Sequence, residues 1–173
     1  MFLELLGVVL AGVTGALVVY AANRATGGRL PRWLMPAVAG LAMIAATISL
    51  EYSWYGRTVA ALPEGIVVAD KVEERAAFRP WTYLVPYVDR FVAVDRTSLR
   101  TNPDRPDERI ATMYFFGRWA PLRRVPVAFD CAGNRRAALV EGADIGTDGA
   151  IEGADWTQAP PDDPLLLVAC AGA

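Results

Sequence analysis

The chain has 173 residues, 54% of them hydrophobic, and a formal net charge of −2, which argues against a general nucleic-acid binder because such a protein presents a basic face. It contains no histidine, which excludes serine–histidine and cysteine–histidine catalysis, histidine-ligated haem and the usual zinc sites. No nucleophile with an activating base, phosphate loop or pair of catalytic carboxylates is recognisable. The sequence therefore predicts a protein that is not an enzyme and holds neither metal nor cofactor.

The first third of the chain predicts a helical hairpin that crosses a membrane twice. Residues 2–22 contain one ionisable side chain, Glu4, and residues 33–54 contain none before Glu51. Each run is about as long as the ~20 residues that cross a hydrocarbon core. Residues 23–32 between them hold three arginines and several turn-forming residues, so they form a short loop.

The charges flanking the two spans predict their orientation. Arginine near a membrane-spanning end marks the cytoplasmic side, and the loop 23–32 has three while no basic residue precedes the first span. We therefore expect a bacterial inner-membrane protein with both termini in the periplasm, a connector over 55–65 and a periplasmic domain over 66–173. The alternative is that 1–22 is a cleaved signal peptide, although such a peptide begins with a positive charge.

Small residues recur at helical spacing in both spans. Gly7, Ala11 and Gly15 lie every four residues in the first, and Ala42 and Ala46 do so in the second. Such stripes allow two helix backbones to approach closely. They pack the hairpin against itself, or one of them receives a helix from another membrane protein.

The residues after the connector predict a small antiparallel β-sheet domain. Segments rich in β-branched and aromatic residues alternate with turn-forming segments. The segment 78–87 has two prolines and predicts a packed loop, and residues 100–107 predict a hydrophilic turn. In residues 123–131 the side chains of Val125, Val127, Phe129 and Cys131 share one face. The strands are expected over 66–73, 91–99, 108–118, 123–131 and 135–141.

The sequence predicts a disulfide between the two cysteines, one of which lies in the apolar segment near the end of the chain. Cys131 and Cys170 are too far apart for a CxxC motif, and in an oxidising periplasm such a pair is most simply a disulfide. Residues 164–170 form a short helix, begun by Asp163 as cap and Pro164 at the first position, or a strand, since periodicity does not separate the two. The fold class is a membrane-anchored α+β protein: a two-helix transmembrane hairpin, then a small antiparallel sheet with one disulfide and a short C-terminal helix.

Several motifs of the second half resemble the surface-adhesin E-like domain of bacterial envelope proteins. They are the strand 91–99 with Asp95 and Ser98, the Phe129-Asp130-Cys131 strand and the terminal cysteine. The resemblance covers about residues 88–171 and implies a small sheet with a helix and one disulfide, exported across the inner membrane. Because such adhesins are usually secreted or lipid-anchored, the two-helix anchor departs from that pattern.

Charge is distributed unevenly in the C-terminal part. Residues 137–173 carry seven acids and no basic residue, so this stretch is a solvated loop or a docking surface for a basic periplasmic protein or neighbouring subunit. The arginines that precede it pair with these acids or bind anionic lipid headgroups. Asp144 to Gly149 resembles the start of a calcium loop but lacks its closing glutamate, so an ordinary acidic turn is expected. The candidate docking residues are Glu141, Asp144, Asp148, Glu152 and Asp155, with Trp81 and Tyr83 from the aromatic segment.

These features favour a non-catalytic accessory or assembly subunit of a larger inner-membrane complex of the respiratory or photosynthetic kind. Its expected partners are other integral membrane subunits, membrane lipids and a basic periplasmic protein, and not nucleic acid. The alternative is an independent membrane-anchored module that binds a ligand in the envelope, in the manner of an adhesin.

Overall fold

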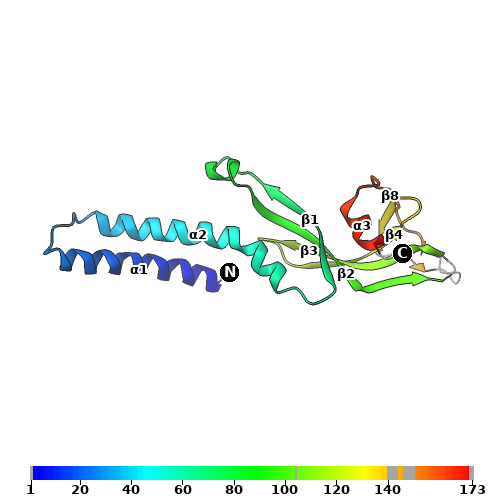
Figure 1. The fold of residues 1–173 in the computed structure, drawn as a ribbon, viewed down its shortest axis with the longest axis horizontal. Coiled ribbons are helices and arrows are strands. Elements are labelled where there is room, and N and C mark those ends of the chain that lie inside the picture. Colours follow the sequence, from blue (N-terminus) through cyan, green and yellow to red (C-terminus); the bar gives the residue numbers. More distant parts are fainter. Residues whose placement is uncertain (1, 104, 140–143, 146–150, 172–173) are drawn as a thin grey trace. The chain divides into compact units, whose positions relative to one another are not determined.

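The computed structural model describes residues 2–103, 105–139, 144–145 and 151–171. They belong to two compact units, Met1–Arg57 and Thr58–Ala173. The first holds two long apolar helices, and the second holds an antiparallel sheet, a disulfide and a short helix, as the sequence predicts (Figure 1). The helices are α1 (Phe2–Ala25), α2 (Leu34–Ala60) and α3 (Pro164–Cys170), with a 3₁₀ turn η1 (Pro80–Tyr83).

Helices α1 and α2 are each long and apolar enough to cross a membrane. At about 1.5 Å per residue the shorter of the two is about 36 Å long. Helix α2 continues beyond Trp54, as expected for the connector, and ends at Ala60. In the turn between the helices Gly27 and Gly28 have positive φ, and the Asn23 side chain accepts a hydrogen bond from the Leu30 N–H at 3.0 Å.

The domain is a six-stranded antiparallel sheet in the order β1-β2-β3-β4-β5-β8, with β6 and β7 paired separately. Each strand from β1 to β5 is hydrogen-bonded to the next in the chain, so the sheet is a meander. The strands are β1 (Ile66–Glu74), β2 (Tyr87–Asn102), β3 (Arg105–Gly117), β4 (Arg123–Asp130), β5 (Arg135–Ala138), β6 (Asp144–Ile145), β7 (Ile151–Glu152) and β8 (Thr157–Gln158).

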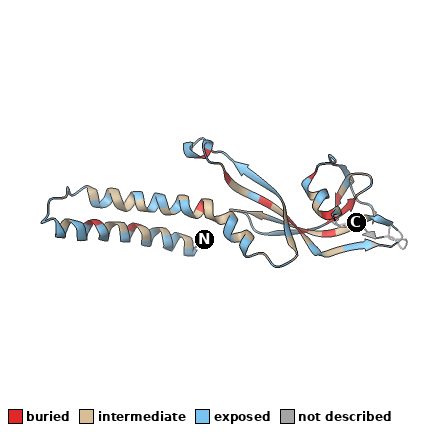
Figure 2. Ribbon diagram, in the orientation of Figure 1, coloured by how far each residue is buried: buried red, intermediate tan, exposed pale blue. Residues whose placement is uncertain are grey.

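The main core lies between one face of the sheet and α3. Register pairs place apolar side chains of neighbouring strands side by side, such as Val94 with Met113 and Ala111 with Val127. Leu166 and Ala169 of α3 pack into the same cluster and are almost completely buried. Buried residues, red in Figure 2, lie along the central strands and on α3. The position of α3 therefore depends on this apolar contact.

Three local predictions were wrong in detail. Most of the expected hydrophilic turn 100–107 is strand, because Thr101 pairs with Arg109 and Asn102 with Arg105, so β2 and β3 continue almost to the turn. The strand expected to reach residue 141 ends at Ala138. Ala128, which the alternation places on the face opposite to Val127 and Phe129, is also fully buried.

Candidate interaction surfaces

The disulfide ties the end of β4 to the end of α3. Cys131 and Cys170 are bonded, with their Cα atoms 5.9 Å apart, as predicted. Nearby, the Arg109 side chain donates a hydrogen bond to the carbonyl of Ala169 at 3.2 Å, and Arg96 donates to that of Ala171 at 3.2 Å. These contacts fix the last helix at the end of the sheet where β3 begins.

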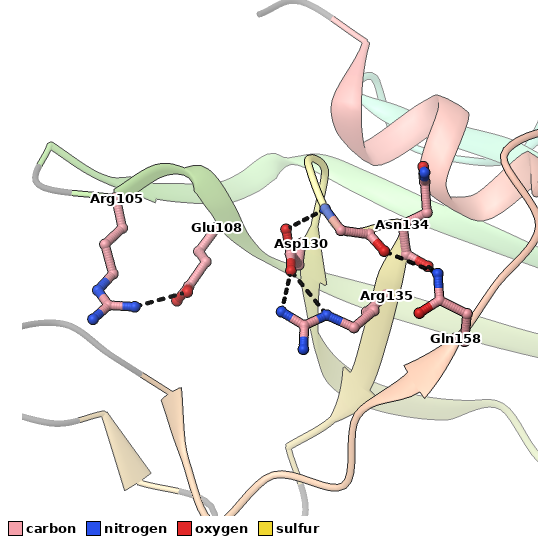
Figure 3. Close-up of polar contacts among 7 residues, drawn as sticks. Arg105, Glu108, Asp130, Asn134, Arg135 and Gln158 are labelled. Carbon is pink, nitrogen blue, oxygen red and sulfur yellow. Dashed lines mark hydrogen bonds and ion pairs between the residues drawn. The ribbon is translucent and has the colours of Figure 1, made fainter.

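Asp130, next to the disulfide, organises the turn from β4 to β5 (Figure 3). Its carboxylate accepts hydrogen bonds from the Gly133 N–H at 2.8 Å and from Arg135 Nε at 3.0 Å. A side chain at position 133 would displace this carboxylate, so glycine allows the turn to keep its hydrogen bonds. Burial alone would raise the pKa of Asp130, but the hydrogen bonds from Gly133 and Arg135 lower it more, and the net effect is a pKa below the ordinary value.

Strand β8 is attached to this same turn. Gln158 donates from its side-chain nitrogen to the carbonyls of Gly133 at 2.9 Å and Asn134 at 3.1 Å (Figure 3). Asn134 has a φ of 51°, a conformation that asparagine tolerates better than most residues. The Ala159 N–H adds a bond of 2.9 Å to the Asn134 carbonyl. The turn therefore fixes β8, where the chain returns to the sheet after the segment that follows β5.

Asp163 begins α3 and also binds the sheet. Its side chain accepts from the backbone N–H groups of Leu165 at 2.9 Å and Leu166 at 3.2 Å, as the predicted cap. It also pairs with Arg136 of β5, at 2.9 Å between Nη1 and Oδ2. Residues 164–170 are therefore a helix, and the strand alternative is wrong.

The predicted acidic docking residues lie in this segment. Asp144 and Glu152 are register partners in β6 and β7, and Asp155 is exposed. Glu141 and Asp148 lie outside the described residues. Residues 125–173 contain eight acids and two arginines, Arg135 and Arg136, which pair with Asp130 and Asp163. By sequence, residues 125–173 therefore carry a net negative charge.

The other candidate docking residues, Trp81 and Tyr83, lie at the opposite end of the sheet. They belong to η1, in the loop 75–86 between β1 and β2. The buried Thr82 fixes this loop, since its hydroxyl donates to the Arg79 carbonyl at 2.7 Å and accepts from the Ala76 N–H at 2.9 Å. Trp81 and Tyr83 are exposed. The candidate residues therefore form two surfaces and not one.

In the hairpin, the small residues differ in what they contact. A Cβ on Gly15 would lie 3.1 Å from that of Ala42, so this glycine allows α1 and α2 to approach each other. Gly7 has no atom of another element within 4 Å of its Cβ position. Gly12, which the spacing argument missed, is buried against Met43. Ala11 and Ala46 are partly buried.

Sequence reasoning also missed a hollow beside residues 118–122, the loop between β3 and β4. The hollow has a volume of about 680 Å³, and its lining includes Arg90, Phe91, Phe116, Arg118, Trp119 and Arg123. The arginines that precede the acidic stretch include Arg118, Arg123, Arg135 and Arg136. The register places the first two and the last two at opposite ends of β4. The Arg118-Trp119 pair between two strands was the available signal.

The described residues contain no group of three or more cysteine, aspartate and glutamate side chains that could hold a metal ion. The domain presents two possible contact surfaces. One lies at the end that carries the disulfide and the acidic C-terminal stretch, and the other lies at the aromatic end with its arginines. No protein-family model matches the chain, and no curated protein or solved structure is detectably similar to it. The class that the fold defines is an apolar helical hairpin joined to a disulfide-closed antiparallel sheet.

Proposed function

We propose that this chain is a non-catalytic accessory or assembly subunit of a bacterial inner-membrane complex of the respiratory or photosynthetic kind. The hairpin crosses the membrane with both termini in the periplasm, and the domain contacts partner subunits there. The disulfide supports this orientation because disulfides persist in oxidising compartments. The three arginines of the interhelical loop support it from the other side of the membrane.

The proposal rests on one observation: contact between α1 and α2 buries only a small part of their side-chain surface. In α1 the buried residues are Gly12 and Val19, and in α2 the buried residue is Glu51. Gly7 and Gly40 have open space where a Cβ would lie. Small residues allow close approach of a further helix, and the uncovered face therefore suits another membrane subunit. The acidic end then provides a charged contact outside the membrane.

Purification of the tagged full chain in mild detergent tests the proposal. We expect integral membrane proteins to co-purify with the wild type and to be lost from a Gly7→Ile variant, whose larger side chain meets nothing inside the hairpin. The matched control is Val18→Ile, on an exposed part of the same helix. A wild-type chain that purifies alone contradicts the proposal and favours the independent envelope-binding module.

A further inference from the structure

Two loops lie at the same end of the sheet. The register pairs Glu74 with Tyr87, so the loop 75–86 joins the last pair of β1 and β2. It also pairs Arg90 with Gly117, which places the loop 118–122 beside the start of β2. We call these two loops, with Arg90, Arg123 and Arg124, the basic aromatic end.

Large apolar side chains of both loops are exposed to solvent. Leu84 is 88% exposed, Phe78 78% and Trp119 57%, and the loop around η1 is mostly pale blue in Figure 2. Val85 and Leu122 are exposed as well. A soluble surface with so many exposed apolar side chains at one end of a sheet is unusual and marks a contact with a membrane or a protein.

Arginine is concentrated at the same place. Residues 75–90 and 117–124 contain six arginines and one aspartate, whereas the whole chain has a net charge of −2. The nearest acids on β1 are Glu73, which pairs with Lys71 at 2.8 Å, and Glu74. The basic aromatic end is therefore positive, and it is complementary to an anionic surface.

The arginines and the rings are stacked in amphipathic pairs. The Arg118 guanidinium lies 4.8 Å from the centre of the Trp119 ring, and that of Arg79 lies 5.2 Å from the centre of the Phe78 ring. Aromatic rings sit at the headgroup level of a bilayer, and guanidinium groups bind phosphate in a forked geometry. Such a pair matches the two layers of a membrane interface.

The hollow of about 680 Å³ lies between the loop 118–122 and the facing parts of β2 and β3. Phe91, which is fully buried, stacks on Phe116 at 4.6 Å between ring centres, and both line it with Arg118 and Arg123. A site with an apolar floor and arginines at its edge has room for a lipid headgroup and the adjacent part of its acyl chains.

The C-terminal part of the domain is acidic by sequence, and the tether of the domain is short. Residues 137–173 carry seven acids and no basic residue, and an anionic surface repels such a stretch. Five residues, 61–65, separate α2 from β1, a distance of about 20 Å at most. If α2 crosses the membrane, the start of β1 at Ile66 stays within that distance of the end of α2, and a positive surface of the domain is attracted to an anionic bilayer.

From these observations we propose that the basic aromatic end binds the surface of the bilayer, with its arginines on the phosphates of anionic phospholipids and its aromatic rings at the headgroup level. This goes beyond the proposed function, because it assigns a lipid and not a subunit to this surface. It leaves the acidic end directed away from the membrane, available to a protein partner.

Amide hydrogen exchange of the full chain in lipid nanodiscs tests this proposal. We expect the amides of residues 75–86 and 118–122 to exchange at least tenfold more slowly in nanodiscs with about one third phosphatidylglycerol than in pure phosphatidylcholine. Amides of β8 serve as the internal control and should not differ. Equal rates in the two lipids overturn the proposal, and so does protection that depends on a co-purified protein.

A pair of charge variants sharpens the test. An arginine near an anionic surface contributes about fivefold to binding, so Arg118→Gln with Arg123→Gln should remove most of the lipid-dependent protection. Arg100→Gln with Arg105→Gln makes the same charge change on exposed residues at the opposite end and should leave it intact. Equal loss of protection in the two double variants, or no loss in either of them, contradicts the assignment of this surface. Loss of partner co-purification would instead bear on the proposed function.

Discussion

Removing the disulfide should destabilise the domain by an amount that follows from the length of the loop it closes. Cys131 and Cys170 are 39 positions apart, and closing a loop of this length lowers the entropy of the unfolded chain enough to contribute about 4 kcal/mol at 25 °C. The double variant Cys131→Ala with Cys170→Ala should lose most of that free energy of unfolding. For a domain of this size the loss lowers the melting temperature by on the order of 15 °C.

The structure also predicts where the loss appears first. The loop closed by the disulfide contains β5, β8 and α3, whereas β1, β2 and most of β3 are held by their own register. Urea-dependent amide hydrogen exchange of the full chain in mild detergent measures these segments separately. Amides of α3 and β8 should open at lower urea in the variant than in the wild type, and reduction of the wild type should give the same change. A loss below about 1 kcal/mol, or equal loss in α1 and α2, would refute the reasoning.

Three further variants test individual contacts in the same assay. Asp130→Asn should cost about 2 kcal/mol at neutral pH, since charged hydrogen bonds are lost. Because the folded state lowers the pKa of Asp130, this difference should be constant above about pH 4 and shrink below it as the carboxylate is protonated; a difference that grows in acid contradicts the account. Asp163→Ala should cost about 1–2 kcal/mol through the lost cap, while the exposed neighbour control Asp162→Ala changes little; equal effects would remove the capping role. Gly15→Ile should separate the hairpin helices, measured as faster exchange in α2, whereas unchanged exchange would show that this contact does not hold them.

Much of the fold could be predicted because local signals agreed with tertiary contacts. Asp163 before Pro164 predicts a helix start, and the structure adds the Arg136 ion pair that a single sequence does not reveal. Periodicity left residues 164–170 undecided because a short apolar run fits both a helix and a strand. In the structure this segment is a helix, and its residues Leu166 and Ala169 pack against the sheet.

The surfaces were harder to predict because they depend on register. Arg123 and Arg135 are twelve positions apart in sequence, yet they lie at opposite ends of β4 and its turn. Ala128 follows the polar side of its strand's alternation but is fully buried. The hollow combines residues of β2 with residues near the turn from β3 to β4, and the Arg118-Trp119 pair alone does not reveal that these two segments meet.

The central claim is that the chain crosses the membrane twice and leaves its domain outside the cytoplasm, and the chain's single lysine, Lys71, tests it directly. Lys71 is exposed on β1, so a membrane-impermeant amine reagent applied to intact spheroplasts should label it. A lysine introduced as Arg29→Lys in the loop between α1 and α2 should react only after lysis. Labelling of Lys71 only after lysis, with Arg29→Lys labelled in intact spheroplasts, would contradict the proposed topology.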